Sequence, residues 1–180
     1  MILSYSINKA NIPESENSLT VYKDKDETCI EVLGEVITPG IYNLNEGATI
    51  SDAIKRAGGL KKSLIIDKSY KDFRLKNGGK ITIQKITANR VRVKIERMEA
   101  HKLIIFSIPL DINTANQQDL LALPGIGPKT ALSIIKHRDK NKGFSSIEEL
   151  KEVKGIGKAR YKRVKKMLEI VDAGNLIIGN

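Results

Sequence analysis

Two stretches decide the fold of the second half of the chain: Leu123-Pro124-Gly125-Ile126-Gly127 and Val153-Lys154-Gly155-Ile156-Gly157. An offset of 30 residues superimposes them, and the same offset pairs Leu120 with Leu150, which indicates a duplicated unit. Each copy is predicted to contain a short helix, a tight Gly-Ile-Gly turn and a second helix. The structure expected for residues 109–170 is therefore all-α and internally repeated.

Each turn combines two glycines with an isoleucine between them. Because glycine has no Cβ atom, we expect both glycines to allow positive φ angles and to leave the backbone open to a ligand. We expect the isoleucine to enter the core and to hold the turn rigid. Pro128 directly follows the first turn, where a helix tolerates the missing N–H group. A second helix is therefore predicted to start right after each turn.

Capping residues and apolar spacing predict the helices around the turns. Asn113 or Thr114 is expected to cap the first short helix, and Ser145 or Ser146 the corresponding helix of the second copy. The last helix is expected to bury an apolar stripe at helical spacing. This stripe consists of Tyr161, Val164 and Leu168.

The charge of the chain favours a polyanionic partner. Its 180 residues include 31 Lys and Arg against 21 Asp and Glu, which gives a formal net charge of +10. The cations are concentrated in residues 151–168, where Glu152 is the one acidic residue. Aromatic residues make up only 4% of the chain and Trp is absent, which argues against recognition by base stacking. Nucleic acid contacted through its phosphates is the partner that these observations favour.

The turns supply the groups that such a ligand needs. Backbone N–H groups at the start of a helix lack partners within the helix, so each turn is predicted to offer them to a phosphate oxygen. Basic side chains follow at once, and two such turns are stronger evidence than a single Gly-x-Gly sequence. The residues predicted to bind DNA are Gly125, Ile126, Gly127, Lys129, Thr130, Lys154, Gly155, Ile156, Gly157, Lys158 and Arg160.

The composition disfavours metal and redox sites. A single cysteine, Cys29, rules out an internal disulfide framework and a cysteine-based zinc site. The two histidines, His101 and His137, are well separated in the sequence, and His137 is expected to be a phosphate neighbour or a surface residue. No catalytic residue, no metal site and no cofactor is therefore predicted.

The sequence predicts a small α+β module over residues 28–85, because β-branched residues are frequent there and Gly and Pro residues separate them into short segments. Residues 1–27 are polar and irregular, and residues 171–180 form a tail. Residues 86–108 could extend the sheet of the module or form a stiff connection. The predicted elements are strands over Cys29–Leu33 with Val36-Ile37, Ile41–Leu44, Leu64–Ile66 and Lys80–Ile83, and a helix over Thr49–Ala57 that stops at Gly58-Gly59.

On these motifs the second half resembles the tandem helix-hairpin-helix domain of the ComEA family, the DNA receptors of bacterial natural transformation. Besides the two turns, three short segments match the pattern of that domain. They are Ile112-Asn113-Thr114-Ala115, Gly143-Phe144 and Ile147-Glu148-Glu149-Leu150. One position departs from the internal repeat: Ala131 in the first copy corresponds to Tyr161 in the second, which affects helix packing.

The first half resembles the SLBB domain, which has a β-grasp-like fold. The matching segments are Val32–Val36, Pro39–Tyr42, Ile50–Ile54 and Ala57–Leu60, whereas Tyr70-Lys71-Asp72-Phe73 departs from the usual pattern. The expected fold class is thus α+β: a β-grasp-like SLBB module followed by an all-α tandem helix-hairpin-helix domain.

The resemblance implies a non-enzymatic receptor that binds double-stranded DNA without sequence preference, through the backbone across the minor groove. It also implies self-association through the SLBB-like domain and contact with other DNA-uptake machinery. Cys29–Leu33 could be an edge strand available for pairing or a buried core strand. Such receptors carry an N-terminal membrane anchor, which this chain lacks, so we expect an ectodomain from the extracytoplasmic face of the membrane that is soluble as given.

Two other classes of protein remain as alternatives. A repair glycosylase or nuclease would need converging carboxylates or a metal site, whereas Asp111, Asp119, Asp139 and Asp172 are scattered. Asp111 and Asp119 are expected at helix starts. The other alternative is an envelope polysaccharide-associated SLBB scaffold with an accessory DNA-binding module, since SLBB domains also occur in polysaccharide-export proteins.

Overall fold

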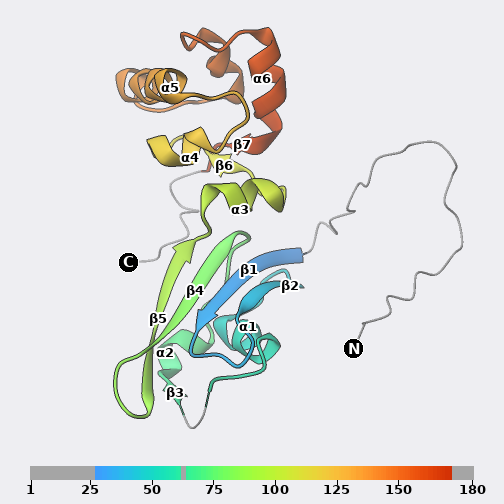
Figure 1. Ribbon diagram of the computed structural model, residues 1–180, viewed down its shortest axis with the longest axis vertical. Helices are drawn as coiled ribbons and strands as arrows, with labels where there is room; N and C mark the ends of the chain where they lie inside the picture. The colour runs from blue at the N-terminus through green and yellow to red at the C-terminus, as the bar shows by residue number, and fades with distance from the viewer. Residues whose placement is uncertain (1–26, 62–63, 172–180) are drawn as a thin grey trace, which may run out of the picture.

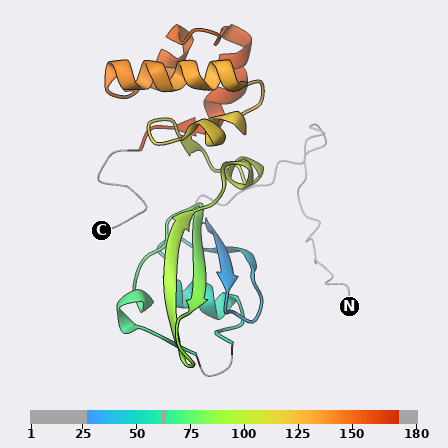
Figure 2. The ribbon, with the colours of Figure 1, turned by 60° about the vertical axis from the view of Figure 1, so that its left-hand side comes forward.

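The computed structural model describes residues 27–61 and 64–171. Within these residues a sheet lobe (residues 27–97) and a helical lobe (residues 109–171) are stacked end to end, with helix α3 (Ala100–Ile105) between them (Figure 1). After a turn of the view, α5 (Pro128–Asn141) lies across the helical lobe above the sheet (Figure 2). No helix in the described part of the chain is both long and apolar enough to cross a membrane.

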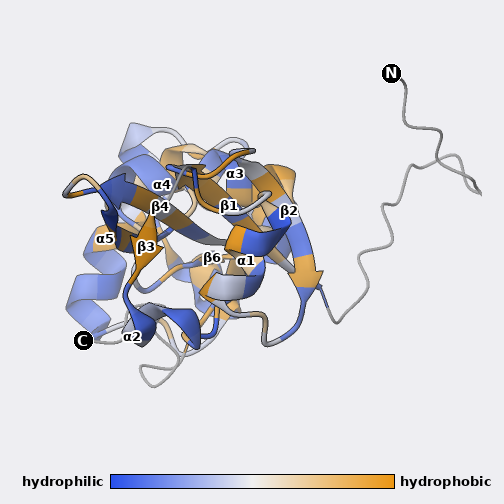
Figure 3. Cartoon of the chain, turned by 90° about the horizontal axis from the view of Figure 1, so that it is seen from below, coloured by the Kyte–Doolittle hydropathy of each residue, from blue (hydrophilic) through white to orange (hydrophobic). Residues whose placement is uncertain are grey.

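The sheet lobe is built on five strands in the order β2-β1-β4-β5-β3. The pairs β1–β2 and β4–β5 are antiparallel, whereas β1–β4 and β3–β5 are parallel. Seen from below, the apolar β3 lies next to the hydrophilic α2 (Figure 3). The elements are β1 (Glu27–Gly34), β2 (Gly40–Asn45), α1 (Ile50–Arg56), β3 (Ile65–Ile66), α2 (Lys68–Lys71), β4 (Gly79–Lys85) and β5 (Arg90–Arg97).

Period-two patterning of the strands creates the core of this lobe. Alternate residues of β1, β4 and β5 point to one face of the sheet, where α1 covers them. Helix α1 starts at Thr49, whose side chain forms a capping box with Asp52, and the chain leaves the helix through Gly58 at φ +80°. The buried residues of this core include Ile30, Val32, Ile50, Ala53, Ile81, Ile83, Val91 and Val93.

Strand β1 answers one question left open by the sequence and corrects one prediction. It lies between β2 and β4, so Cys29–Leu33 is an interior strand and not a free edge. The predicted continuation of the strand through Val36-Ile37 is wrong, because β1 ends at Gly34 with φ +89°. Beyond that bend Val36 forms only an isolated bridge with Leu60.

The segment 86–108 both extends the sheet and connects the lobes. Strand β5 pairs along its length with β4, so the alternating residues Val91–Glu96 belong to the sheet. Helix α3 (Ala100–Ile105) follows, and its Leu103 packs into the core of the helical lobe. That core also includes Cys29 from the sheet lobe and Met98, which lies between β5 and α3. The two lobes are therefore joined by a shared apolar core.

The helical lobe contains the predicted repeat. Its first copy consists of α4 (Gln117–Leu121) and α5 (Pro128–Asn141), and its second of the 3-10 helix η1 (Ile147–Glu152) and α6 (Lys158–Val164). Strand β6 (Leu110–Asp111) pairs in parallel with β7 (Leu168–Glu169), which follows the 3-10 helix η2 (Lys165–Met167). This pairing joins the start of the lobe to its end. The two copies share one core, which includes Leu120, Leu123, Ile126, Ala131, Ile134, Leu150, Val153, Ile156 and Val164.

Two predictions about these helices need correction. Asn116, and not Asn113 or Thr114, caps α4, because its side chain accepts from Asp119 N while Asp119 accepts from Asn116 N. Thr114 instead donates its hydroxyl hydrogen to buried Asp111. The last helix ends before Leu168, which is buried in β7. The expected cap of the second copy is confirmed at Ser146, which forms a capping box with Glu149.

Charged side chains support the joint between the lobes. Lys102 Nζ lies 2.6 Å from Glu31 Oε1 and 2.9 Å from Glu99 Oε2, and Lys80 Nζ lies 2.9 Å from Glu99 Oε1. Hydrogen bonds from Lys80 and Lys102 lower the pKa of Glu99 to about 2. Glu99 thus links β4 to α3, and its charged form stabilises the folded state.

This linkage predicts a defined pH dependence. Because the folded-state pKa of Glu99 lies below its usual value of 4.5, the stabilisation is complete above pH 4.5 and is lost as the pH falls toward 2. Glu99→Gln should lower the free energy of unfolding at pH 6 by at most about 1 kcal/mol, since the side chain is partly exposed. Urea unfolding at pH 6 and at pH 3 should show that the free energy of unfolding falls less between these two pH values in the variant than in the parent. An equal loss in both proteins would contradict this role, and Glu152→Gln serves as the surface control.

Candidate nucleic-acid interface

The first hairpin has two glycines with different tasks. Gly125 adopts φ +80°, a conformation in which other residues are strained, and so allows the chain to reverse after α4. Gly127 is the N-cap of α5 with φ −96°, and a Cβ atom placed on it would meet no atom within 4 Å. Between them Ile126 is only 4% exposed and packs into the core. The turn is therefore held on its core side by Ile126 and is open on its solvent side at Gly127.

The second hairpin repeats this geometry. Gly155 has φ +95°, Gly157 is the N-cap of α6 with φ −83°, and Ile156 is 4% exposed. The prediction that both isoleucines enter the core is thus confirmed. The prediction that both glycines of each turn have positive φ is wrong, because only the first does. The second glycine is extended, and its lack of a side chain leaves the start of the following helix open.

The two hairpins lie beside each other. A Cβ atom on Gly125 would lie 3.1 Å from Arg163 Nη1 of α6, and a Cβ atom on Gly155 would lie 3.3 Å from Thr130 Oγ1 of α5. Arg160 donates a hydrogen bond to the carbonyl oxygen of Gly155. Each hairpin is therefore contacted by the second helix of the other copy.

An open hollow brings all five predicted residues of the first hairpin together with one from the second copy. Lys129 is exposed there, whereas Thr130 is buried where the hairpins meet. Lys154 and Lys158 are exposed on the second hairpin, outside this hollow. Among the described residues, no acidic side chain lines the hollow. Its lining residues are Gly125, Ile126, Gly127, Pro128, Lys129, Thr130 and Arg160.

Tyr161 explains how the second copy differs from the first. Where the first copy has the fully buried Ala131, Tyr161 fills the space and its ring lies 4.5 Å from Lys151 Nζ. The Tyr161 hydroxyl donates to Glu148 Oε1 at 3.2 Å. Desolvation and the Glu148 charge raise the pKa of Tyr161, while hydrogen bonds from its own backbone and from Tyr161 lower the pKa of Glu148. Tyr161 thus contacts both the Lys151 ammonium group and the Glu148 carboxylate beside the second hairpin.

Sequence reasoning missed two residues of this region. Arg163 belongs to the basic run that the sequence showed, but its position beside Gly125 follows only from the packing of the two copies. Asn113 joins the copies, since its side chain accepts from Phe144 N at 2.7 Å and donates to Phe144 O at 3.0 Å. His137, expected to be a phosphate neighbour or a surface residue, is partly buried and stacks on Phe144 with ring centroids 5.0 Å apart.

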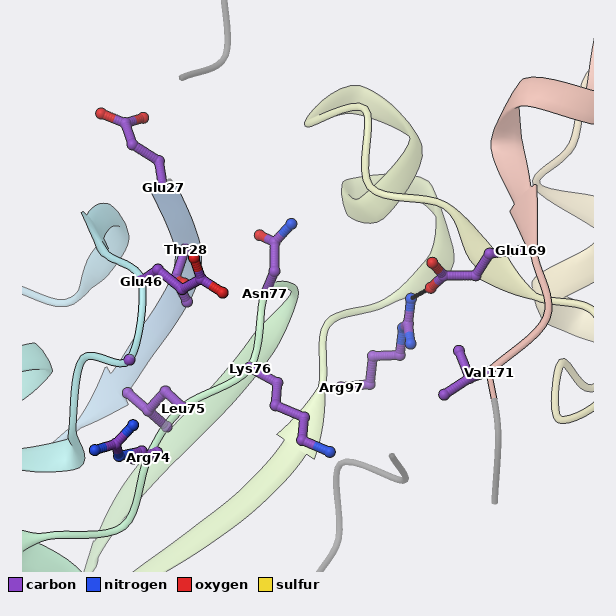
Figure 4. A pocket seen from close by; sticks show the side chains of 11 residues that line it. Glu27, Thr28, Glu46, Arg74, Leu75, Lys76, Asn77, Arg97, Glu169 and Val171 are labelled. Carbon is purple, nitrogen blue, oxygen red and sulfur yellow. Dashed lines mark hydrogen bonds and ion pairs between the residues drawn. The ribbon is translucent and has the colours of Figure 1, made fainter. Parts of the chain in front are cut away.

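A second hollow lies between the lobes and holds none of the predicted DNA-binding residues. Figure 4 shows Arg97 and Glu169 pointing toward each other across it, with Arg97 Nη2 3.3 Å from Glu169 Oε1. Lys76 and Arg74 lie on the side of the sheet lobe, together with Glu27 and Glu46. This hollow carries charges of both signs and so lacks the uniform charge of the hairpin surface.

Two of the four acids that the sequence singled out, Asp111 and Asp119, hold local structure by hydrogen bonds, and Asp172 lies outside the described residues. Asp111 accepts from Asn113 N and from the Thr114 hydroxyl, and Asp119 completes the cap of α4. Within residues 27–61 and 64–171, no group of three or more His, Cys, Asp or Glu side chains could hold a metal ion.

Comparison with known proteins agrees with this two-part structure. Residues 107–169 match the helix-hairpin-helix motif family, and residues 29–64 match the SLBB domain family. ComE operon protein 1 of Bacillus subtilis is 25% identical over 179 residues, which cover 87% of this chain and 79% of that protein. The resemblance to ComEA-type proteins is confirmed. The expected fold class, an SLBB module followed by helix-hairpin-helix elements, is confirmed as well.

Shorter similarities involve other proteins. An uncharacterized protein of Haemophilus influenzae is 42% identical over 60 residues, which cover 33% of this chain and 54% of that protein. The human endonuclease/exonuclease/phosphatase family domain-containing protein 1 is 39% identical over 56 residues. This match covers 31% of the chain and only 10% of the human protein, so it gives no support for an active site.

The different tasks of the two glycines predict different costs of substitution. Gly125→Ala should lower the free energy of unfolding by about 1–2 kcal/mol, because alanine is strained at φ +80°. Gly127→Ser should leave stability unchanged within about 0.5 kcal/mol, because serine is a favourable N-cap and its Cβ atom meets no neighbour. Thermal and urea unfolding of both variants measure this difference. Equal destabilisation would contradict the division of tasks.

Proposed function

We propose that this chain binds double-stranded DNA without sequence preference and serves as a receptor in DNA uptake during natural transformation. The observation that carries the proposal is the pair of neighbouring Gly-Ile-Gly hairpins, open at Gly127 and Gly157 and flanked by exposed Lys129, Lys154 and Lys158. Similarity to a ComE protein and the helix-hairpin-helix match support DNA binding in competence.

The chemistry of the hairpins favours the DNA backbone over the bases. N–H groups at the start of α5 and the nearby cations suit phosphate oxygens, which carry no base identity. The predicted site has no aromatic side chain for base stacking, since its members are glycines, isoleucines, a threonine and basic residues. We therefore assign the eleven predicted residues to phosphate binding, with Ile126 and Ile156 acting from the core and buried Thr130 acting where the hairpins meet.

The cellular setting of the proposal rests on the ComEA-type similarity. We propose that the protein acts at the extracytoplasmic face of the membrane, without enzymatic activity, and hands DNA to other uptake machinery. Self-association through the SLBB domain would let several copies hold one DNA molecule and raise the avidity. Because β1 is an interior strand, edge pairing would use β2 or β3.

The test measures DNA affinity against salt for the full chain, because Cys29 and Met98 belong to the core of the helical lobe and a truncated lobe would lose them. Unrelated duplexes of equal length should bind alike. If about 4–6 phosphates are neutralised, log K should fall with log salt at a slope of roughly −4 to −5. Fluorescence anisotropy at several salt concentrations gives both quantities.

A hairpin variant separates backbone contact from general attraction by charge. Gly127→Val combined with Gly157→Val keeps every charge and places a side chain over each open turn, so it should weaken DNA binding at least tenfold. Ala88→Val, at an exposed position of the β4–β5 loop, is the matched control and should bind like the parent. Unchanged binding by the folded double variant would refute the hairpin mechanism. Binding of envelope polysaccharide in place of DNA would support the scaffold alternative.

A further inference from the structure

Arg163 holds an unusual position at the first hairpin. It belongs to α6 of the second copy, yet its Nη1 atom lies 3.1 Å from the place where a Cβ atom of Gly125 would be. The close approach is possible because Gly125 has no side chain. The first hairpin thus has a guanidinium group beside it that its own copy does not supply.

The charge of this guanidinium group is not neutralised by any side chain in the part of the chain that the structure describes. Arg163 is exposed, and no carboxylate forms an ion pair with it among the residues that the structure describes. Arg160, by contrast, donates to the carbonyl oxygen of Gly155 and is partly buried. A guanidinium group offers paired donors that suit phosphate oxygens. Among the described residues, Arg163 therefore has donors without a partner, and it lies beside Gly125, which lines a hollow whose described lining contains no acidic residue.

The two copies contribute unequally to each other. Thr130 of α5 and Arg160 of α6 are equivalent in the repeat, and each lies beside the hairpin of the opposite copy: Thr130 next to Gly155, and Arg160 with its Nε atom 3.9 Å from the Cβ position of Gly125. The guanidinium group of Arg160 thus lies between the two hairpins, since it also donates to the carbonyl oxygen of Gly155, whereas Arg163 lies beside the first hairpin. From the opposite copy, the first hairpin therefore receives two guanidinium groups, one of them shared, and the second hairpin receives a hydroxyl group.

We propose that Arg163 binds the DNA phosphate held at the first hairpin, so that this phosphate site is composed of residues from both copies of the repeat. The inference rests on the proposed DNA binding and adds a residue to it. The first hairpin and Lys129 contribute one side of the site, and Arg163 contributes the other. A single copy of the repeat would supply only half of this site.

The test compares two substitutions that remove the same charge from neighbouring positions of α6. Arg163→Gln should weaken binding several-fold and make the salt slope less steep by about 0.9, the value for one lost phosphate contact. Lys162→Gln is the matched control: Lys162 is exposed, and it is not among the nearest neighbours of any hairpin glycine. It should leave the slope unchanged. Equal effects of both substitutions would overturn the proposal.

A double substitution tests whether the site is shared. If Arg163 and Lys129 bind the same phosphate, their substitutions should not act independently. The fold-loss of DNA affinity in the Arg163→Gln, Lys129→Gln double variant should then be smaller than the product of the fold-losses in the two single variants. A loss equal to that product would place Arg163 on another phosphate and overturn the shared site. Failure of DNA binding itself is seen separately, as weak binding by the parent or unchanged binding by the Gly127→Val, Gly157→Val variant.

Discussion

The burial of Ile126 and Ile156 is the constraint on which the rest of the helical lobe depends. Each isoleucine fixes a turn from inside the core, so the glycine after it can remain at the surface without support from neighbouring side chains. A turn held only by its own hydrogen bonds would lose conformational entropy on meeting a ligand. Here that entropy is lost during folding, which leaves the hairpins preorganised.

How much could be predicted depended on whether the signal was local. The turns, the α1 helix and its glycine stop, and the cap at Ser146 follow from neighbouring residues, and the structure confirms them. The end of β1 at Gly34 could not be predicted, because it depends on contact with Ile83 of a distant strand. The position of Arg163 at Gly125 depends in the same way on the packing of one copy against the other.

The glycines of the two turns also could not be told apart from the sequence. Two glycines in a turn suggest two positive φ angles, yet only Gly125 and Gly155 have them. Gly127 and Gly157 have ordinary backbone angles and are open to solvent, so folding alone does not require glycine there. A position where glycine is unnecessary for the fold directs attention to the approach of a ligand. The sequence pattern placed both glycines in each turn but did not distinguish the positive φ of the first from the extended conformation of the second.

The parallel pairing of β6 with β7 has a mechanical consequence. Because these strands are neighbours, the helical lobe begins and ends at one place, beside the Arg97–Glu169 contact with the sheet lobe. A pulling force on bound DNA would enter the lobe at the hairpins and leave it through β6 toward the sheet. Because β7 comes from the end of the second copy, its hydrogen bonds to β6 would oppose separation of the first copy from the second under such a force.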